Sequence, residues 1–81
     1  MKLLYTPQFK RSLKKFTQEI RDKFYKQAEF LQTDFMHPSL HAKKYDEKHD
    51  IWQARVDKRV RFYFTIRGST YILFNIREHP K

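Results

Sequence analysis

The spacing of apolar residues changes along the chain, from a helical period in the first half to a period of two in the second. Near the start, Thr6 is a favourable helix N-cap, and Pro7 suits the first helical position because its missing N–H is not needed there. Phe9, Leu13 and Phe16 then recur at the spacing of one helix face. The pattern predicts a helix that begins at Pro7.

A second helix is predicted directly after the first. Thr17 is a second N-cap candidate, and Glu19 stands in the first turn, where the helix dipole favours a carboxylate. An apolar stripe then continues at helical spacing for about four turns, through Ile20, Phe24, Ala28 and Leu31. Two consecutive amphipathic helices indicate an αα-hairpin.

The segment of residues 37–50, HPSLHAKKYDEKHD, shows neither period. His, Pro and charged residues dominate it, and only Leu40, Ala42 and Tyr45 are suited to anchor it. We expect a loop here, and its length makes it a candidate for function.

After Asp50, apolar and polar residues alternate with a period of two, which is typical of half-buried strands. Asp57-Lys58 and Arg67-Gly68-Ser69 fall where hairpin turns belong. The pattern predicts three antiparallel strands whose inward side chains are Trp52, Ala54 and Val56, then Val60, Phe62, Phe64 and Ile66, and last Ile72, Phe74 and Ile76. The apolar face would pack on the helical hairpin, in an α+β fold with a small, mainly antiparallel sheet.

The opposite face of the predicted sheet is basic. Side chains two apart on a strand share a face, so the positions between the apolar ones point outward. This outward set comprises Arg55, Arg61, Tyr63, Asn75 and Arg77, and the same parity adds His79. A register shift of one residue would reverse the faces, so the prediction depends on the register.

Composition limits the classes of protein. A chain of 81 residues is long enough for a single domain, residues 1–81. It has 18 Lys and Arg against 9 Asp and Glu, a net charge of +9, which favours polyanions or an acidic protein as partners. The absence of cysteine excludes a disulfide scaffold, a thiol nucleophile and thiolate metal ligands. No apolar run is long enough for a signal peptide or a membrane span, so a soluble, cytoplasmic protein is expected.

The outward face suits a phosphodiester. Guanidinium groups bind phosphate bidentately and stay charged, and around a scissile phosphate they would stabilise the transition state. His79 can transfer a proton near neutral pH, and Tyr63 and Tyr45 offer faces for single-stranded bases. Without a carboxylate cluster for divalent metal, a metal-free RNase that uses the 2′-hydroxyl of its substrate is favoured over a two-metal nuclease. An arginine-rich strand face is also typical of an ordinary solvated surface, and that interpretation stays open.

Four stretches carry a resemblance to a known family: YTPQFKRSLKKF, HPSLHAKK, IWQARVDKRVRFYFTIRG and TYILFNIREH. Over essentially its whole length, the chain resembles the RelE/ParE superfamily of toxins from bacterial toxin–antitoxin systems. The resemblance implies the element order β-α-α-β-β-β. Members of the RelE, YoeB, HigB and YafQ kind are ribosome-dependent mRNA interferases, which cut mRNA in the ribosomal A site with no metal or other cofactor. The implied partners are a cognate antitoxin, the 70S ribosome and mRNA, with operator DNA bound through the antitoxin and no membrane.

The resemblance also implies roles for individual residues. Arg61 matches the family's transition-state arginine, and Arg77 with His79 matches the pair at the end of the last strand. Glu47 stands near the general base of YoeB-like members, so His79 and Glu47 are both candidates for proton transfer. Contacts to RNA or the ribosome fall to Lys43, Lys44, Arg55, Arg59 and Tyr63.

Two other functions on the same fold remain open. One is a ParE-like inhibitor of DNA gyrase, although ParE-type members typically lack the catalytic Arg and His set. The other is a catalytically inactive antitoxin-binding protein that acts as a co-repressor. It stays open because Pro80 and Lys81 follow His79, where many family members carry an aromatic residue.

Overall fold

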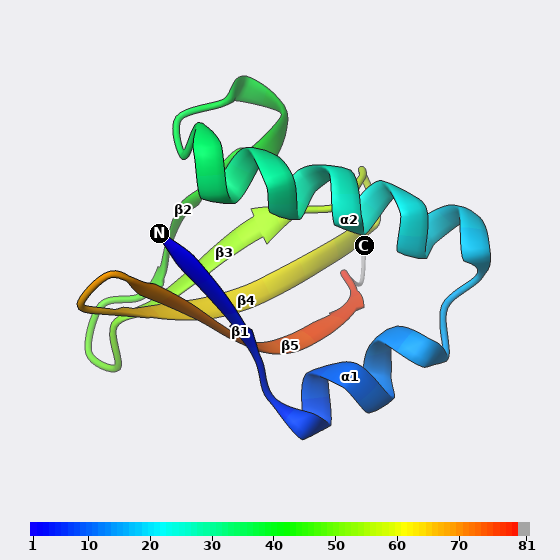
Figure 1. The fold of residues 1–81 in the computed structure, drawn as a ribbon, viewed down its shortest axis with the longest axis horizontal. Helices are drawn as coiled ribbons and strands as arrows, with labels where there is room; N and C mark the ends of the chain where they lie inside the picture. Colours follow the sequence, from blue (N-terminus) through cyan, green and yellow to red (C-terminus); the bar gives the residue numbers. More distant parts are fainter. Residues whose placement is uncertain (80–81) are drawn as a thin grey trace.

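The structure, a computed structural model that describes residues 1–79, is a five-stranded sheet with two α-helices on one of its faces (Figure 1). The elements in chain order are β1 (Lys2–Tyr5), α1 (Pro7–Lys14), α2 (Gln18–Thr33), the 3₁₀ helix η1 (Pro38–Leu40), β2 (Lys43–Asp46), β3 (Ile51–Arg55), β4 (Val60–Arg67) and β5 (Thr70–Glu78). The strand order is β1-β5-β4-β3-β2, with β1 parallel to β5 and all other neighbours antiparallel. The predicted α+β class and mainly antiparallel sheet are confirmed.

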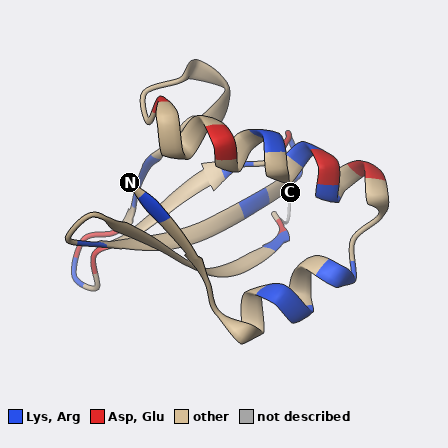
Figure 2. Cartoon of the chain, viewed as in Figure 1, with Lys and Arg blue, Asp and Glu red and all other residues tan. Residues whose placement is uncertain are grey.

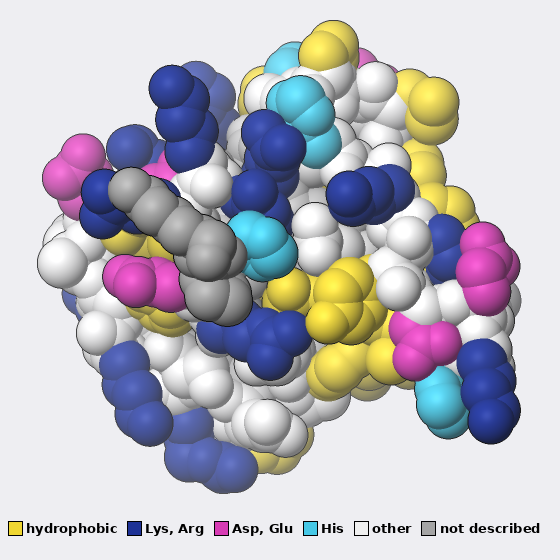
Figure 3. Space-filling model, turned by 180° about the vertical axis from the view of Figure 1, so that it is seen from behind, with side chains coloured by type: hydrophobic (Ala, Val, Ile, Leu, Met, Phe, Trp, Pro, Cys, Tyr) yellow, Lys and Arg dark blue, Asp and Glu magenta, His cyan; other side chains and the backbone are white. Residues whose placement is uncertain are grey.

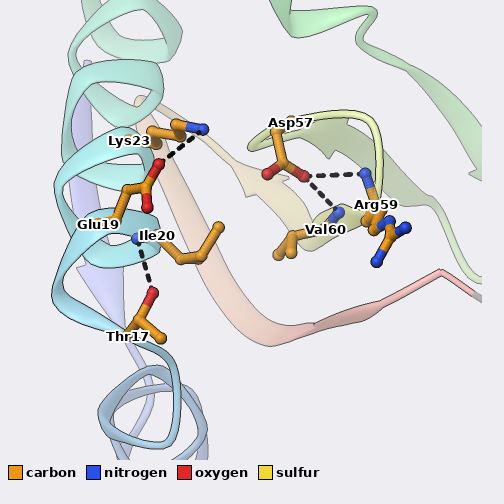
Figure 4. A network of polar contacts seen from close by, with 7 residues as sticks. All are labelled: Thr17, Glu19, Ile20, Lys23, Asp57, Arg59 and Val60. Carbon is orange, nitrogen blue, oxygen red and sulfur yellow. Dashed lines mark hydrogen bonds and ion pairs between the residues drawn. The ribbon is translucent and has the colours of Figure 1, made fainter.

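Both helices begin where the sequence predicts. The Thr6 hydroxyl accepts a hydrogen bond from the Phe9 N–H at 3.1 Å, and the Thr17 hydroxyl accepts one from the Ile20 N–H at 3.3 Å. Figure 4 shows the second of these caps. Each bond satisfies a donor that the first helical turn leaves without a partner, which fixes the helix start.

Aromatic side chains join the two layers. Phe9 from α1 and Phe24 from α2 are fully buried, with ring centroids 5.2 Å apart. Phe24 also meets the β4 residue Phe62 edge to face, at 5.3 Å and 87°. Such pairs add specific geometry to the burial of large apolar surfaces, so they set how the helical hairpin lies on the sheet.

The segment predicted as one loop, residues 37–50, contains two regular elements. Leu40 at the end of η1 is fully buried, and β2 pairs with β3 in the register Lys43↔Gln53 and Lys44↔Trp52. The prediction was wrong here because β2 is short and lies at the sheet edge. Its mostly polar residues show no apolar alternation.

The prediction for β5 is half wrong. Ile76 is buried as expected, but Tyr71 and Leu73 are buried in place of Ile72 and Phe74. Residues 71–74 are all apolar, so their sequence gives no signal of which parity faces the core.

A β-bulge causes this change of parity. Tyr63 pairs with Asn75, whereas the next β4 residue, Phe64, pairs with Leu73, which leaves Phe74 as the extra residue on β5. One inserted residue reverses the alternation on one side of the bulge. Asn75 and Arg77 follow the bulge and keep the predicted outward orientation. The predicted basic face of the sheet is therefore retained.

The remaining structural findings concern the chain end and membranes. Pro80 and Lys81, where the sequence departs from the family pattern, lie outside the described residues. Within residues 1–79, no helix combines the length and apolarity that crossing a membrane requires.

Candidate active site

Three arginines lie directly abreast on adjacent strands. Arg55 on β3 pairs in register with Arg61 on β4, and Arg61 pairs with Arg77 on β5. We call these three residues the arginine row. Side chains directly opposite on neighbouring strands have Cβ atoms about 4.5–5.5 Å apart, and like charges placed so are destabilising. The row thus concentrates positive charge on the sheet face opposite the helices.

No carboxylate of residues 1–79 forms an ion pair with the arginine row. The ion pairs in this part of the chain have Lys23, Lys44 and His49 as their cations. Figure 2 shows acidic residues on α2, in the turns between β2 and β3 and between β3 and β4, and at the end of β5, and none on α1. Asp57 in the β3–β4 turn and Glu78 at the end of β5 are the acidic residues nearest to the row in the chain, and neither forms an ion pair with it.

An open cavity of about 640 Å³ lies beside the row. Its nine lining residues come from the segment after η1, from β2, β3 and β4, and from the end of β5: His41, Ala42, Lys43, Lys44, Tyr45, Gln53, Arg55, Arg61 and His79. We call it the basic pocket. Figure 3 shows Lys, Arg and His side chains gathered together on this face of the molecule. The predicted residues Lys43, Lys44, Arg55, Arg61 and His79 are thus brought together.

The turn between β3 and β4 holds Arg61. Its side chain is only 7% exposed, and its Nη1 donates to the carbonyl oxygens of Asp57 and Lys58, each at 2.9 Å. The Asp57 carboxylate in turn accepts hydrogen bonds from the Arg59 and Val60 N–H groups, both at 2.8 Å (Figure 4). The Arg61 guanidinium is therefore fixed before any ligand arrives.

Arg77 extends the row beyond the pocket. Its guanidinium lies over the Tyr63 ring at 4.9 Å, and its Nη2 donates to the Tyr45 hydroxyl at 3.4 Å. The phenols of Tyr63 and Tyr45 raise the pKa of Arg77 above its ordinary value. The side chain is exposed and permanently charged, next to the pocket rather than in its wall.

The structure separates the two tyrosines proposed for base stacking. Tyr63 is 3% exposed and lies beneath Arg77 and Tyr45, whose ring is 5.0 Å away, so it has no free face for a base. Tyr45 is 51% exposed and lines the basic pocket. Tyr45 is therefore the ring that a base can reach.

His79 is fixed to the sheet through its backbone. Its N–H donates to the Arg59 carbonyl at 2.6 Å, which continues the pairing of β4 and β5 by one residue. The imidazole is exposed and lines the basic pocket with Arg61. Arg59 itself is exposed in the β3–β4 turn and supplies this carbonyl; its side chain does not line the pocket.

Glu47 is not brought to the pocket. It is exposed in the turn that precedes β3, whereas Arg55 ends that strand (Figure 1). Four steps along β3, at about 3.3 Å each, separate the two ends. The Lys44 ammonium lies 3.7 Å from Glu47 and 2.6 Å from Asp50, and the hydrogen bond to Asp50 raises the pKa of Lys44. Lys44 therefore has its charge compensated, unlike the arginines.

Two residues of this region were missed by the sequence analysis. Gln27 in α2 is 7% exposed, and its Nε2 donates to the carbonyls of Ser39 at 3.1 Å and Arg55 at 3.0 Å. A signal for it existed, because an amide three residues after Phe24 falls within the apolar stripe. His41 lines the basic pocket, but nothing in the sequence marks it, since its place depends on how η1 is held.

Metal-ligand types do not cluster in this part of the molecule. Within residues 1–79 there is no group of three or more His, Asp or Glu side chains placed to hold a metal ion. The donors that face the pocket are cations, phenol and imidazole groups, with one amide.

Toxins of known structure share this fold. The YoeB/ParE toxin from Agrobacterium tumefaciens matches with a TM-score of 0.80 and 15% identity, over 99% of this chain and 100% of that one. A chain of the RelB–RelE antitoxin–toxin complex from Methanococcus jannaschii gives 0.76 and 21%, over 93% and 88%. YafQ from E. coli strain BL21(DE3) gives 0.78 and 10%, over 95% and 91%.

Comparison with protein-family models gives no match, and comparison with curated protein sequences gives none either. The low identities to the solved toxins make this a likeness of fold. The chain shares its fold with these solved toxins, and the resemblance seen in the sequence motifs is confirmed at the level of the fold.

Proposed function

We propose that this chain is the toxin of a toxin–antitoxin module and acts as a ribosome-dependent, metal-independent endoribonuclease on mRNA. The arginine row is the observation that carries the proposal. Three arginines pair in register on adjacent strands with no ion-pair partner among residues 1–79, and a bound phosphodiester would relieve the repulsion between their charges.

The chemistry uses the substrate's own 2′-hydroxyl. The 2′-oxygen attacks the adjacent phosphorus, the bond to the 5′-oxygen breaks, and a 2′,3′-cyclic phosphate is left. Arg61, held by the turn, and Arg77 stabilise the additional negative charge of the transition state. His79 transfers a proton at the pocket wall. RNA is the substrate because DNA lacks this nucleophile.

The proposed partners follow from charge and from the relatives. A net charge of +9 suits ribosomal RNA, mRNA and an acidic antitoxin, and the Methanococcus jannaschii relative was solved in an antitoxin–toxin complex. Binding of operator DNA is assigned to the complex, through the antitoxin. Lys43 and Arg55 in the pocket wall would contact the RNA backbone.

Primer extension in a reconstituted translation system tests the proposal. A defined mRNA is incubated with the protein, with and without ribosomes, and with the Arg61→Ala and Lys48→Gln variants. We expect cleavage within A-site codons only when ribosomes are present, loss of cleavage in Arg61→Ala, and little change in Lys48→Gln, because Lys48 is exposed in the β2–β3 turn and does not line the basic pocket. Circular dichroism of each variant verifies that the fold is intact.

The same experiment separates the other functions. Intact mRNA with inhibited supercoiling by purified gyrase would identify a ParE-like gyrase inhibitor. Intact mRNA, active gyrase and unimpaired growth on expression without antitoxin would identify an inactive co-repressor. Either result would overturn the nuclease function.

A further inference from the structure

Cleavage through a 2′-hydroxyl needs two proton transfers, and the basic pocket contains a second imidazole besides His79. We propose that His41 and His79 are the general acid–base pair of this site and that Glu47 takes no part. The proposal rests on the nuclease function above and adds a catalytic residue to it.

His41 and His79 lie on opposite sides of two arginines. His41 precedes β2 and lines two hollows together with Arg55, while His79 follows β5 on the far side of Arg61. Strands β3 and β4 lie between β2, which His41 precedes, and β5, which His79 follows. Both imidazoles line one cavity, so a phosphodiester bound on Arg55 and Arg61 lies between them.

The backbone of His41, whose side chain is exposed, is anchored by the residues before it. Leu40, directly before it, is fully buried, and the His41 N–H donates to the Pro38 carbonyl at 3.3 Å. The single amide of Gln27 binds the carbonyls of both Ser39 and Arg55. The segment that ends in His41 is thereby tied to the strand end that carries Arg55.

The backbone of His41 is itself unusual. Its φ of 45° and ψ of 42° place it in the left-handed region, which glycine adopts most readily. Residues in this conformation cluster at functional sites, where surrounding contacts enforce them. Here the conformation ends η1 and directs the chain into β2, along the pocket wall.

The other groups around His41 are poorly suited to transfer protons near neutral pH. The cations that face it or share its cavities are Lys43, Lys44, Arg55, Lys58 and Arg61. Ammonium, guanidinium and phenol groups are in general poor at exchanging protons near neutral pH. Imidazole is the side chain that exchanges protons in this range.

Two further titratable groups lie near His41 in adjoining hollows. The Asp57 carboxylate accepts two backbone N–H bonds, and the His37 ring stacks on Phe30 at 3.8 Å. Neither lines the basic pocket, and no carboxylate of residues 1–79 does. His41 and His79 are therefore the pair available to the phosphodiester.

The proton balance of the step is complete with these two groups. One imidazole starts neutral and takes the proton of the 2′-hydroxyl as the bond between the 2′-oxygen and phosphorus forms. The other starts protonated and gives its proton to the 5′-oxygen as the bond from phosphorus to that oxygen breaks. After cleavage the protonation states of the two imidazoles are exchanged.

Single-turnover cleavage of ribosome-bound mRNA, measured against pH, tests the proposal. The variants are His41→Asn, which tolerates the left-handed backbone, His79→Asn, Glu47→Gln and the control His49→Asn. We expect a bell-shaped profile for the unmodified protein and for Glu47→Gln and His49→Asn. The pH–rate profiles of His41→Asn and His79→Asn should each lose one of the two limbs of the bell, and each variant should cleave at least about 10²-fold more slowly. His41→Gly, which relieves the backbone, replaces His41→Asn if that variant does not fold.

A modified substrate separates catalysis from binding. With sulfur in place of the bridging 5′-oxygen the leaving group needs no proton, so the variant that lacks the general acid recovers its rate. We expect recovery in one of the two histidine variants and not in the other. A full rate and an intact profile in His41→Asn, or weaker mRNA binding with both limbs kept, would overturn the role of His41 alone. Absence of ribosome-dependent cleavage by the unmodified protein would overturn the proposed function and this inference together.

Discussion

Two ends of the sheet contain basic side chains and histidines, and they differ in how the charge is paired. In the turn between β2 and β3, the Lys44 ammonium lies 2.6 Å from Asp50, and His49 Nδ1 lies 2.9 Å from the Asp46 carboxylate. At the other end, the arginine row has no carboxylate partner among residues 1–79. The pairing of the charges, rather than their number, distinguishes a solvated turn from a candidate site.

Electrostatic interactions favour folding in the turn between β2 and β3 and oppose it at the arginine row. Exposed ion pairs such as those of the turn contribute little and fade with salt, but they are at worst neutral. Three arginines that pair directly across adjacent strands place like charges opposite one another, which is unfavourable in the absence of an anion. Charge repulsion therefore lowers stability at one end of the sheet, whereas the other end is balanced within itself.

The largest effect is expected from Arg61→Lys. The lysine keeps the charge but loses the planar fork and the two bonds from Nη1 to the turn carbonyls. Loss of one fixed donor to a developing oxyanion lowers the rate about 10²–10³-fold. Single-turnover cleavage on ribosomes measures it, with Lys48→Arg in the β2–β3 turn, outside the basic pocket, as the matched change at the other end. Equal rates for both variants would show that the two ends do not differ in function.

Features that depend on neighbouring residues in the sequence were predicted correctly. Capping threonines located both helix starts, and alternation in Val60–Arg67 oriented Arg61. The first half of β5 was predicted wrongly because residues 71–74 are apolar at both parities, and only packing against β1 and β4 selects Tyr71 and Leu73. The prediction that Arg77 shares a face with Arg55 and Arg61 was unaffected, because the bulge lies before Arg77.

The pocket itself was harder to predict than the row. His41 reaches it through η1 and a bond from Gln27 to a carbonyl 28 residues away, and contacts at that separation leave no periodic signal. Glu47 was expected near the arginines from a family position. The register of β2 with β3 places it at the opposite end of the strand. Both outcomes depend on long-range pairing, which a pattern along the chain does not contain.

The second largest effect is expected from Gln27→Leu, which acts on the basic end alone. The carbonyls of Ser39 and Arg55 would lose their donor in a buried site, at a cost of about 1–3 kcal/mol. Urea unfolding measures the loss. Gln32→Leu is the control on the same helix, because the Gln32 amide binds only the Met1 carbonyl in an exposed position, and we expect little change there. Equal destabilisation in both variants would exclude a special role for Gln27.

A smaller pair of effects should have opposite signs. Arg55→Gln removes one charge from the row, and we expect the free energy of unfolding to rise by about 0.2–1 kcal/mol at low salt. Lys44→Gln removes a paired charge, so the same quantity should fall slightly. Both changes should shrink as salt is added, since exposed charges are screened. Destabilisation by Arg55→Gln at low salt would mean that the row is not under repulsion.

The smallest effect concerns the pH response of the paired end. The hydrogen bond from the His49 side chain, followed by that from its backbone N–H, holds the pKa of Asp46 below its ordinary value. A carboxyl group whose pKa is lowered by folding contributes stability above its unfolded value of about 3.9, and loses it as the pH falls through the folded value. Arginines stay charged throughout this range, so acid removes the stabilisation of the turn and leaves the repulsion in the row unchanged. In His49→Ala the backbone N–H remains, 3.2 Å from Asp46, so we expect the pKa of Asp46 to rise only part of the way. An NMR titration of the carboxyl carbons measures the pKa of Asp46, with His79→Ala as the control variant. If His49→Ala leaves the pKa of Asp46 unchanged, the turn is not held by the pair of His49 and Asp46.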